Sequence, residues 1–301
     1  MNRVTAVDPR DLFKRLAREL PAEVRDHVLV VGSLAAACHH AERIEGGRVR
    51  TKDADLVIHP ASEVTPAALI AGRLRSLGWR QKPSDLAPGL PTTPPQELPA
   101  IRLYPPHHED YFVEVLIVPE GEYVDAKPWV GVELDDGWYG LPSFQFLALT
   151  LIDRQRSEAG LEYAHPSMMA LANLLSHPEL GSHVMSTPIG DRDINRSSKD
   201  LGRVLALARL EPREETERWG SRWRFALETC FPTRWPSLAA RLGRGLRALL
   251  DDDMRFDEAW HCCNVGLLAA MGVTKEQLRF TALQLLQDAI APLEEVALHR
   301  A

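Results

Sequence analysis

The chain has 301 residues, of which 45% are hydrophobic and 26% are charged, and its formal net charge is −7. This composition is typical of an ordinary folded protein, the length favours two domains, and the negative charge argues against broad affinity for nucleic acid. The longest apolar run, over residues 144–152, is too short to cross a membrane, and the N-terminus lacks a signal-peptide core, so we expect a cytoplasmic protein with no membrane partner.

The first predicted helix begins at Pro9, with Asp8 as its N-cap, and Pro21 ends it. Its apolar face consists of Leu12, Phe13, Leu16, Ala17 and Leu20. Residues 28–31, Val-Leu-Val-Val, then predict a short buried strand.

Gly32 and Ser33 break the apolar run after that strand, and the alanine-rich residues 34–38 favour a helix. A strand, a glycine turn and a helix N-terminus together present backbone N–H groups and the positive end of the helix dipole, which suits phosphate. Glycine also lets a ligand approach the backbone closely. Gly32 and Ser33 are therefore candidate phosphate-binding residues. The alternative is an ordinary strand-to-helix turn with Ser33 as its N-cap.

Asp53 and Asp55 open the next predicted strand, which continues through residues 56–58, Leu-Val-Ile. Because side chains alternate along a strand, the two carboxylates point to the same side, about 6.6 Å apart along it. Such a pair repels unless a cation lies between the acids, and Mg²⁺ prefers oxygen ligands and substrate phosphates. The position of the pair at the start of the strand disfavours a phospho-aspartyl mechanism. The alternative is an exposed acidic strand start without a catalytic role.

Thr65 and Pro66 open a further predicted helix, which ends at Gly78 and has Leu69, Ile70 and Leu74 facing inward. The proline-rich residues 82–99 predict a loop. Residues 101–104 and 111–118 then predict two antiparallel strands.

Glu114 is the single acid within the apolar strand at residues 111–118. Runs of this kind are usually buried on both faces, and an ionised carboxylate there needs a partner or a metal. On a strand beside Asp55, Glu114 completes a cluster of three acids. The alternatives are a glutamate that faces solvent from an edge strand and an ion pair with an arginine, for which the candidates are Arg43, Arg48, Arg50 and Arg102.

Residues 132–134 predict a short strand, and helical patterns dominate from Leu141 onward, over residues 144–152, 168–175 and 201–210. Residues 181–195 predict a mobile loop and a candidate lid. After Glu211 we expect only helices, with the tryptophans packed in the core rather than stacked on a nucleotide: Trp219, Trp223, Trp235 and Trp260.

The predicted fold is α/β (α+β): a small mixed β-sheet in residues 1–140, and a mainly helical domain in residues 141–301 that completes a cleft. The four cysteines show no zinc-ligand spacing, which fits buried or free thiols in a reducing compartment.

The order of these motifs resembles that of the DNA polymerase β-like nucleotidyltransferase superfamily, and more narrowly the minimal and abortive-infection-type nucleotidyltransferase toxins and their uncharacterised relatives. The resemblance rests on Gly32-Ser33, on Arg50-Thr51 followed by Asp53 and Asp55, and on Glu114, and it extends to about residue 210. Further along, a proline-led helix at residues 166–175 and the pair Lys199-Asp200 match two later helices of such relatives. Asn173 stands where a lysine is expected there.

The resemblance implies roles for six residues. The triphosphate would be bound by Gly32, Ser33 and Lys199, and Mg²⁺ or Mn²⁺ by Asp53, Asp55 and Glu114, with Glu114 also assisting the acceptor oxygen. The implied reaction transfers a nucleoside monophosphate from a nucleoside triphosphate, ATP among them, and releases pyrophosphate. The acceptor would be a transfer RNA or other RNA, a protein or a small molecule, and a toxin of this kind would have an antitoxin partner.

Two other classes of protein fit the same residues. The first is a nucleotidyltransferase-like module that binds a nucleotide or a protein without turnover, which Asn173 motivates. The second is a helical interaction protein whose first domain is purely structural. Nucleotide binding that depends on Mg²⁺ separates the second class from the enzyme.

Overall fold

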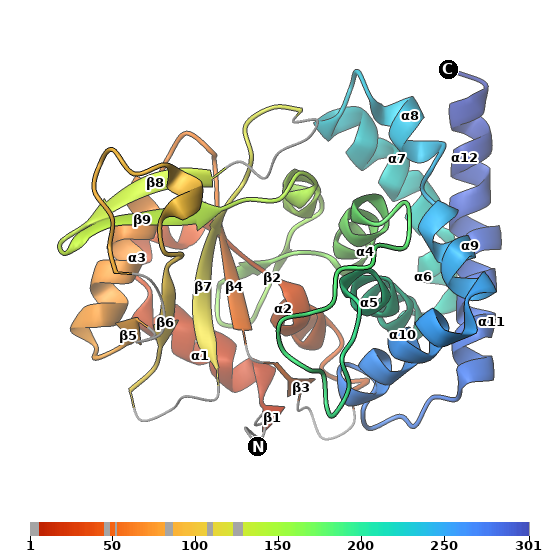
Figure 1. Cartoon of the computed structure of the whole chain (residues 1–301), viewed down its shortest axis with the longest axis horizontal. Coiled ribbons are helices and arrows are strands. Elements are labelled where there is room, and N and C mark those ends of the chain that lie inside the picture. The colour runs from red at the N-terminus through yellow and green to blue at the C-terminus, as the bar shows by residue number, and fades with distance from the viewer. Residues whose placement is uncertain are drawn as a thin grey trace. The chain divides into compact units, whose positions relative to one another are not determined.

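The computed structural model of the chain describes residues 6–44, 49–51, 53–81, 87–106, 111–122 and 129–300. The chain divides into two compact units, one formed by Met1–Ala41 and Arg48–His165 and the other by Glu42–Gly47 and Pro166–Ala301. The first unit contains the β-sheet and the second contains most of the helices, which confirms the predicted α+β fold class (Figure 1).

A seven-stranded mixed sheet forms the centre of the first unit. Its strand order is β10 (Gln155–Arg156), β11 (Glu162–Tyr163), β2 (Val28–Val31), β4 (Asp53–Ile58), β7 (Phe112–Ile117), β6 (Arg102–Tyr104) and β5 (Arg80–Gln81). β11 is parallel to β2, and β4 is parallel to β7, whereas the other neighbours are antiparallel. Two-stranded sheets pair β1 (Ala6–Val7) with β3 (Val49–Arg50) and β8 (Trp129–Leu134) with β9 (Gly137–Pro142).

The strand β11 explains where the first unit ends. It pairs with β2 and therefore keeps the chain in the first unit up to His165. The predicted domain boundary after residue 140 lies inside this unit. The short strands β10 and β11 carry few apolar residues, so hydrophobic periodicity does not reveal them.

Three helices of the first unit surround this sheet: α1 (Pro9–Glu19), α2 (Gly32–His39) and α3 (Thr65–Ser76). The Asp8 carboxylate accepts a hydrogen bond of 2.9 Å from the N–H of Arg10, which confirms Asp8 as the N-cap of α1. The inward position predicted for Leu69 is wrong, since its side chain is 43% exposed. The buried face of α3 instead follows Ala67, Ile70, Ala71 and Leu74.

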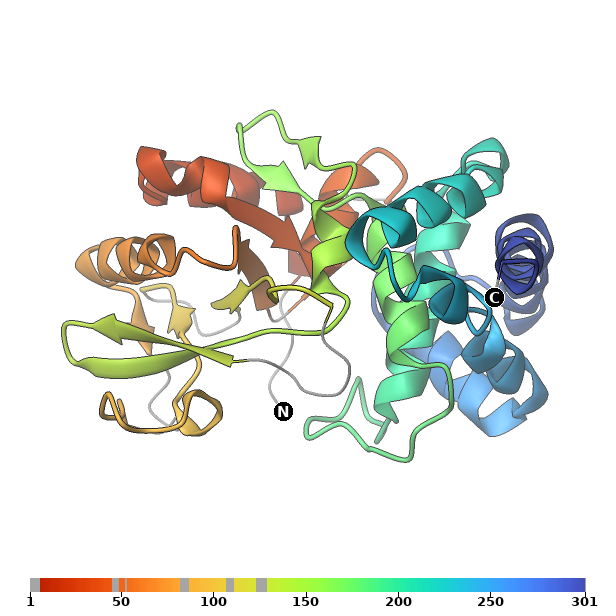
Figure 2. The same ribbon diagram turned by 90° about the horizontal axis from the view of Figure 1, so that it is seen from above.

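Short 3₁₀ helices connect several of these elements: η1 (Ala22–His27), η3 (Pro95–Glu97) and η4 (Leu147–Leu151). The helix predicted over residues 144–152 is reduced to η4, and the chain turns at Asp153, whose φ is +57°. The central strands are buried along most of their length: all four residues of β2, and the last three of β4 and of β7. Figure 2 shows the first unit from above, with α1, α3 and the β8–β9 hairpin beside these strands.

The second unit is built from nine α-helices and one π-helix among the described residues. These are α4 (Pro166–Ser176), α5 (Arg196–Leu210), α6 (Arg213–Glu217), α7 (Trp219–Cys230), α8 (Trp235–Ala239), α9 (Arg244–Asp251), α10 (Asp253–Val265), α11 (Lys275–Leu285), η5 (Leu286–Ile290) and α12 (Ala291–Leu298). The predicted helical character after Glu211 is confirmed, and so is the burial of Trp219, Trp223 and Trp235.

Helix α5 lies at the centre of this unit and packs closely against α10 and α4. The closeness depends on Gly202, because a Cβ built there would lie 2.8 Å from the carbonyl oxygen of Ala259. Residues 181–195 contain isolated bridges but no helix or strand. They are held to α10 by Arg192 with Asp257 at 2.6 Å and by Asn195 with Glu258 at 2.9 Å.

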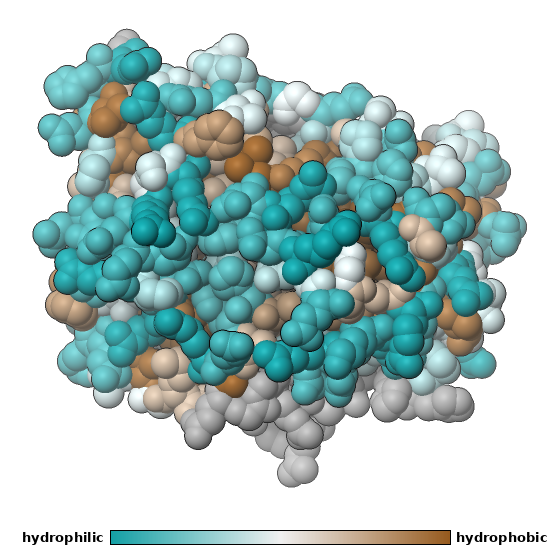
Figure 3. All heavy atoms as spheres, turned by 180° about the vertical axis from the view of Figure 1, so that it is seen from behind, coloured by the Kyte–Doolittle hydropathy of each residue, from teal (hydrophilic) through white to brown (hydrophobic). Residues whose placement is uncertain are grey.

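The described helices include none that is long and apolar enough to cross a membrane. The face of the molecule in Figure 3 is mostly hydrophilic and carries only separate, small hydrophobic areas.

Candidate functional site

Four residues on adjacent strands form a row across the sheet of the first unit. The Cα of Val31 in β2 is paired with that of Asp55 in β4, Asp55 with Glu114 in β7, and Glu114 with Arg102 in β6. Paired residues of neighbouring strands point to the same face of a sheet and lie about 4.8 Å apart. The structure therefore brings Asp55 and Glu114 side by side, although 59 positions separate them in the sequence (114 − 55 = 59).

Asp53 lies on the same face as Asp55, because the burial of β4 alternates at this end: Asp53 and Asp55 are half-buried and Ala54 is buried. The hydroxyl of the buried Thr51 donates to the Asp53 carboxylate at 3.1 Å and to the Asp53 carbonyl oxygen at 2.9 Å. These bonds orient the first acid of the pair. Arg50 and Lys52 flank Thr51, and their side chains lie outside the described residues.

Gly32 begins helix α2 directly after β2 and lies over the Asp55 carboxylate. Its φ of +74° is in the left-handed region, and a Cβ built there would lie 2.7 Å from Oδ2 of Asp55. Both the backbone conformation and the close approach therefore require glycine. Val31 is the N-cap and no side chain caps this helix, so the alternative role of Ser33 as N-cap is wrong. Ser33 occupies the second position of α2, in its first turn.

Glu114 forms an ion pair with Arg102. Nε and one terminal nitrogen of the guanidinium both lie 2.8 Å from Oε1 of Glu114. The side chain of Glu114 is 15% exposed and that of Arg102 is 42% exposed. The pairing with Arg102, which the sequence left open, is thus confirmed. Among the other candidates, Arg43 donates to the carbonyl of Leu210 in the second unit, and the side chains of Arg48 and Arg50 lie outside the described residues.

An aromatic pair borders the acids on the same face. Phe112 is paired in register with Asp53, and its ring centroid lies 5.3 Å from that of Tyr104 in β6. The sequence contains both residues but no pattern that marks them, because their proximity depends on the β6–β7 pairing. Cross-strand aromatic contacts of this type stabilise a sheet locally.

The chemistry of this face fits a hard divalent cation. Asp53, Asp55 and Glu114 supply carboxylate oxygens, which Mg²⁺ and Mn²⁺ prefer as ligands. The three acids are nevertheless not among the described groups whose ligand atoms all lie within 4.8 Å of one another. They share one face and are not gathered around one point, with Glu114 bound to Arg102.

Lys199, the sixth predicted site residue, belongs to the second unit and lies in the first turn of α5. Its neighbour Asp200 accepts a hydrogen bond of 2.8 Å from Nε2 of His177 and lies 3.5 Å from Nε of Arg196. Burial disfavours the ionised form of Asp200, but the bond to His177 and the nearby charges of Arg203 and Lys199 outweigh it and lower its pKa to about 2. Asn173 is half-buried in α4.

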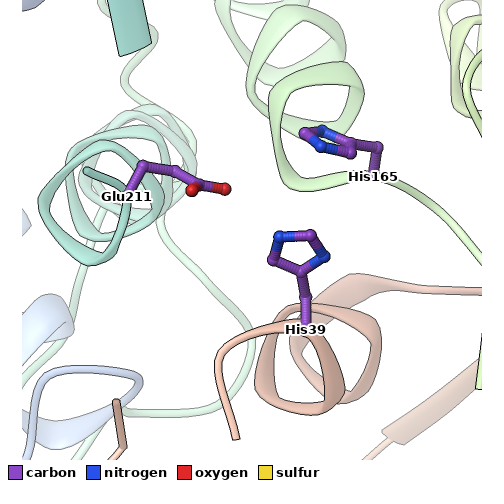
Figure 4. Close-up of side chains that lie close together, drawn as sticks. All are labelled: His39, His165 and Glu211. Carbon is purple, nitrogen blue, oxygen red and sulfur yellow. The ribbon is translucent and has the colours of Figure 1, made fainter. Parts of the chain in front are cut away.

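Two histidines of the first unit lie close together, His39 at the end of α2 and His165 just before α4 (Figure 4). Their ring centroids are 5.0 Å apart, and the ring of His40 lies 4.8 Å from that of His39. Sequence spacing gives no sign of this pair. The two rings meet edge to face, with 66° between their planes. Glu211, also labelled in Figure 4, belongs to the second unit.

The four cysteines are free, as the sequence predicts. Burial raises the pKa of the Cys38 thiol to about 11, that of Cys230 to about 11 and that of Cys262 to about 12, and it also raises the pKa of Cys263. Thiols of this kind are protonated at neutral pH and are poor nucleophiles. The candidate chemistry of the chain therefore lies with its carboxylates.

Comparison with known proteins adds no further constraint: no protein-family model matches the chain, and no curated protein is significantly similar to it.

Proposed function

We propose that this chain is a nucleotidyltransferase that depends on Mg²⁺ or Mn²⁺ and moves a nucleoside monophosphate from a nucleoside triphosphate to an acceptor, with release of pyrophosphate. The observation that carries the proposal is the stacking of three parts: Gly32 lies directly over the Asp55 carboxylate, and Asp55 is in register with Glu114. A phosphate-binding turn and a pair of acids on neighbouring strands are the parts that phosphoryl-type transfer requires.

Each residue has a role in this proposal. The backbone N–H groups at Gly32 and Ser33 bind the triphosphate at the N-terminus of α2. Asp53 and Asp55 hold the divalent cation, which supplies charge neutralisation for the phosphates. Glu114 completes the cation site and also assists the acceptor oxygen by accepting its proton.

The acceptor belongs to one of three chemical classes: an RNA such as a transfer RNA end, a protein side chain, or a small molecule such as an aminoglycoside. If the acceptor is an RNA or a protein of the cell that makes this chain, the chain acts as a toxin. In that case an antitoxin partner is also expected. Because the chain carries a net charge of −7, an RNA acceptor requires a local basic surface and not general attraction.

The test is transfer of label from each of four nucleoside triphosphates, radiolabelled at the α-phosphate, to total RNA, to protein or to an aminoglycoside in the presence of Mg²⁺. We expect label in one acceptor class and none when Asp53→Ala replaces the wild-type chain. Label transfer that persists in Asp53→Ala, or no transfer to any acceptor, contradicts the proposal.

A second candidate function is a module that binds a nucleotide or a protein without turnover. The ion pair of Glu114 with Arg102 favours it, because a carboxylate held by a guanidinium serves a structural role without any cation. Nucleotide binding that is unchanged in Asp55→Asn and is not followed by transfer supports this candidate over the enzyme.

A further inference from the structure

Glu114 lies between two partners of opposite charge in the row across the sheet. Asp55 is its neighbour on one side, in parallel register, and Arg102 is its neighbour on the other, in antiparallel register. Rotation about the side-chain bonds of Glu114 directs its carboxylate to one side or the other. The structure has the carboxylate on the Arg102 side, with two guanidinium nitrogens at 2.8 Å from Oε1.

We propose that Arg102 is a positioning residue that competes with the divalent cation for Glu114, so that the cation site closes only when Glu114 turns from Arg102 toward Asp55. This inference rests on the proposed function, since it concerns the same cation. Arg102 sets how tightly the cation binds before the nucleotide arrives.

The formal charges of Asp53, Asp55, Glu114 and Arg102 support this role. Asp53, Asp55 and Glu114 contribute −3 and Arg102 contributes +1, so the group carries −2, which one divalent cation balances. Removal of the guanidinium leaves −3 and also frees Glu114 to turn toward the cation. Arginine–carboxylate bonds are charge-assisted and strong, so this competition is substantial even though Arg102 is 42% exposed.

The experiment is a calorimetric titration of the full chain with Mn²⁺ in the absence of nucleotide. Arg102→Gln is expected to bind Mn²⁺ about tenfold more tightly than the wild type, because Glu114 loses its guanidinium partner and is free to turn toward the cation. Arg80→Gln is the matched control, since Arg80 is an exposed arginine on the adjacent strand β5, and its Mn²⁺ affinity should equal that of the wild type. Equal or weaker Mn²⁺ binding by Arg102→Gln overturns the inference.

A double variant tests whether Arg102 acts through Glu114. In a Glu114→Gln background, Arg102→Gln is expected to change the Mn²⁺ affinity by less than about twofold, because the coupled partner is absent. A tenfold gain in that background contradicts the proposed route. If Arg102 only supports the fold, Arg102→Gln does not tighten Mn²⁺ binding in either background.

Two further results keep the test decisive. If Arg102→Gln fails to fold, Arg102→Lys replaces it in the test. Lysine keeps the positive charge but lacks the planar guanidinium that holds the Glu114 carboxylate. Tighter Mn²⁺ binding than that of the wild type then supports the inference, and equal or weaker binding overturns it. Wild-type Mn²⁺ binding that Asp55→Asn abolishes, together with no effect of Arg102, defeats only this inference. Absence of any Asp55-dependent binding defeats the proposed cation site itself and this inference with it.

Discussion

Oδ2 of Asp55 lies 2.7 Å from the point that a Cβ at Gly32 would occupy. The two residues come from different elements, the first residue of α2 and the third residue of β4, and the antiparallel pairing of Val31 with Asp55 brings them together. Position 32 therefore requires glycine for two reasons: its φ is positive, and the Asp55 carboxylate leaves no room for a Cβ. The turn that is proposed to bind phosphate and the strand that is proposed to bind the cation are thus parts of one local structure.

Gly32→Ala is therefore expected to lower stability and to abolish cation binding together. The positive φ costs an alanine about 1–2 kcal/mol, and the new methyl group also displaces the Asp55 carboxylate. Gly160→Ala is the matched control, because Gly160 has a φ of +84° and no atom within 4 Å of its would-be Cβ. Thermal unfolding and Mn²⁺ titration of both variants separate the two effects. Wild-type Mn²⁺ affinity in Gly32→Ala contradicts the account.

Asp55→Asn is expected to reduce transfer at least about 100-fold, a loss of the size seen when one charge-stabilising group is removed from an active site. Asparagine keeps the shape of the side chain but not its charge, so the fold should persist. The measurement is the rate of label transfer at saturating Mg²⁺, with circular dichroism as the check on folding. Asp153→Asn changes a charge at a turn of the same unit and should leave the rate unchanged.

The stability of the second unit is expected to fall as acid is added, through Asp200. Its pKa is about 2 in the folded chain and 3.8 normally, because the bond to His177 and the charges of Arg203 and Lys199 outweigh the opposing effect of burial. Between these values the unfolded chain binds a proton that the folded chain does not. The stabilisation is therefore complete above about pH 4 and is lost as the pH falls toward 2, by about 2 kcal/mol.

Denaturant unfolding at several pH values between 2 and 5 tests this expectation. The wild type should lose stability more steeply over this range than Asp200→Asn, which has no carboxyl to titrate at this position. Equal slopes for the two chains show that Asp200 does not contribute.

Gly202→Ala is expected to destabilise the second unit by about 1–3 kcal/mol, because its Cβ would lie 2.8 Å from the carbonyl oxygen and 3.1 Å from the Cα of Ala259. These are backbone atoms of α10, so no side chain can move aside. Gly72→Ala is the same substitution in α3, where nothing lies within 4 Å of the would-be Cβ, and its expected effect is the opposite. It should stabilise the first unit by about 0.5–1 kcal/mol through helix propensity. Melting curves of both variants measure the two effects. A Gly202→Ala variant that is as stable as the wild type contradicts the tight packing of α5 against α10.

Much of the first unit follows from local patterns in the sequence. The run Val28–Val31 predicts β2 with its observed ends, and Asp8 with Pro9 predicts the start of α1. These elements are predictable because a buried strand and a capped helix each leave a short, strong pattern. The strands β10 and β11 and the end of the unit at His165 are not predictable in this way, because two-residue strands are defined by their partners.

The candidate site is predictable in its residue types and not in its contacts. Alternation along a strand places Asp53 and Asp55 on one face, but only the strand order sets Glu114 beside Asp55. The same holds for Arg102. The sequence offers four arginines as partners of Glu114, and only the β6–β7 register identifies Arg102 as the one beside it. Long-range pairing depends on the whole sheet, and no short segment encodes it.

The most direct test of the account is a crystal structure of the chain with Mg²⁺ and a non-hydrolysable nucleoside triphosphate. The account predicts triphosphate oxygens against the N–H groups at Gly32 and Ser33, a cation bound by Asp53 and Asp55, and Glu114 turned from Arg102 toward the cation. A nucleotide bound elsewhere, or one bound with no cation at Asp53 and Asp55, contradicts it.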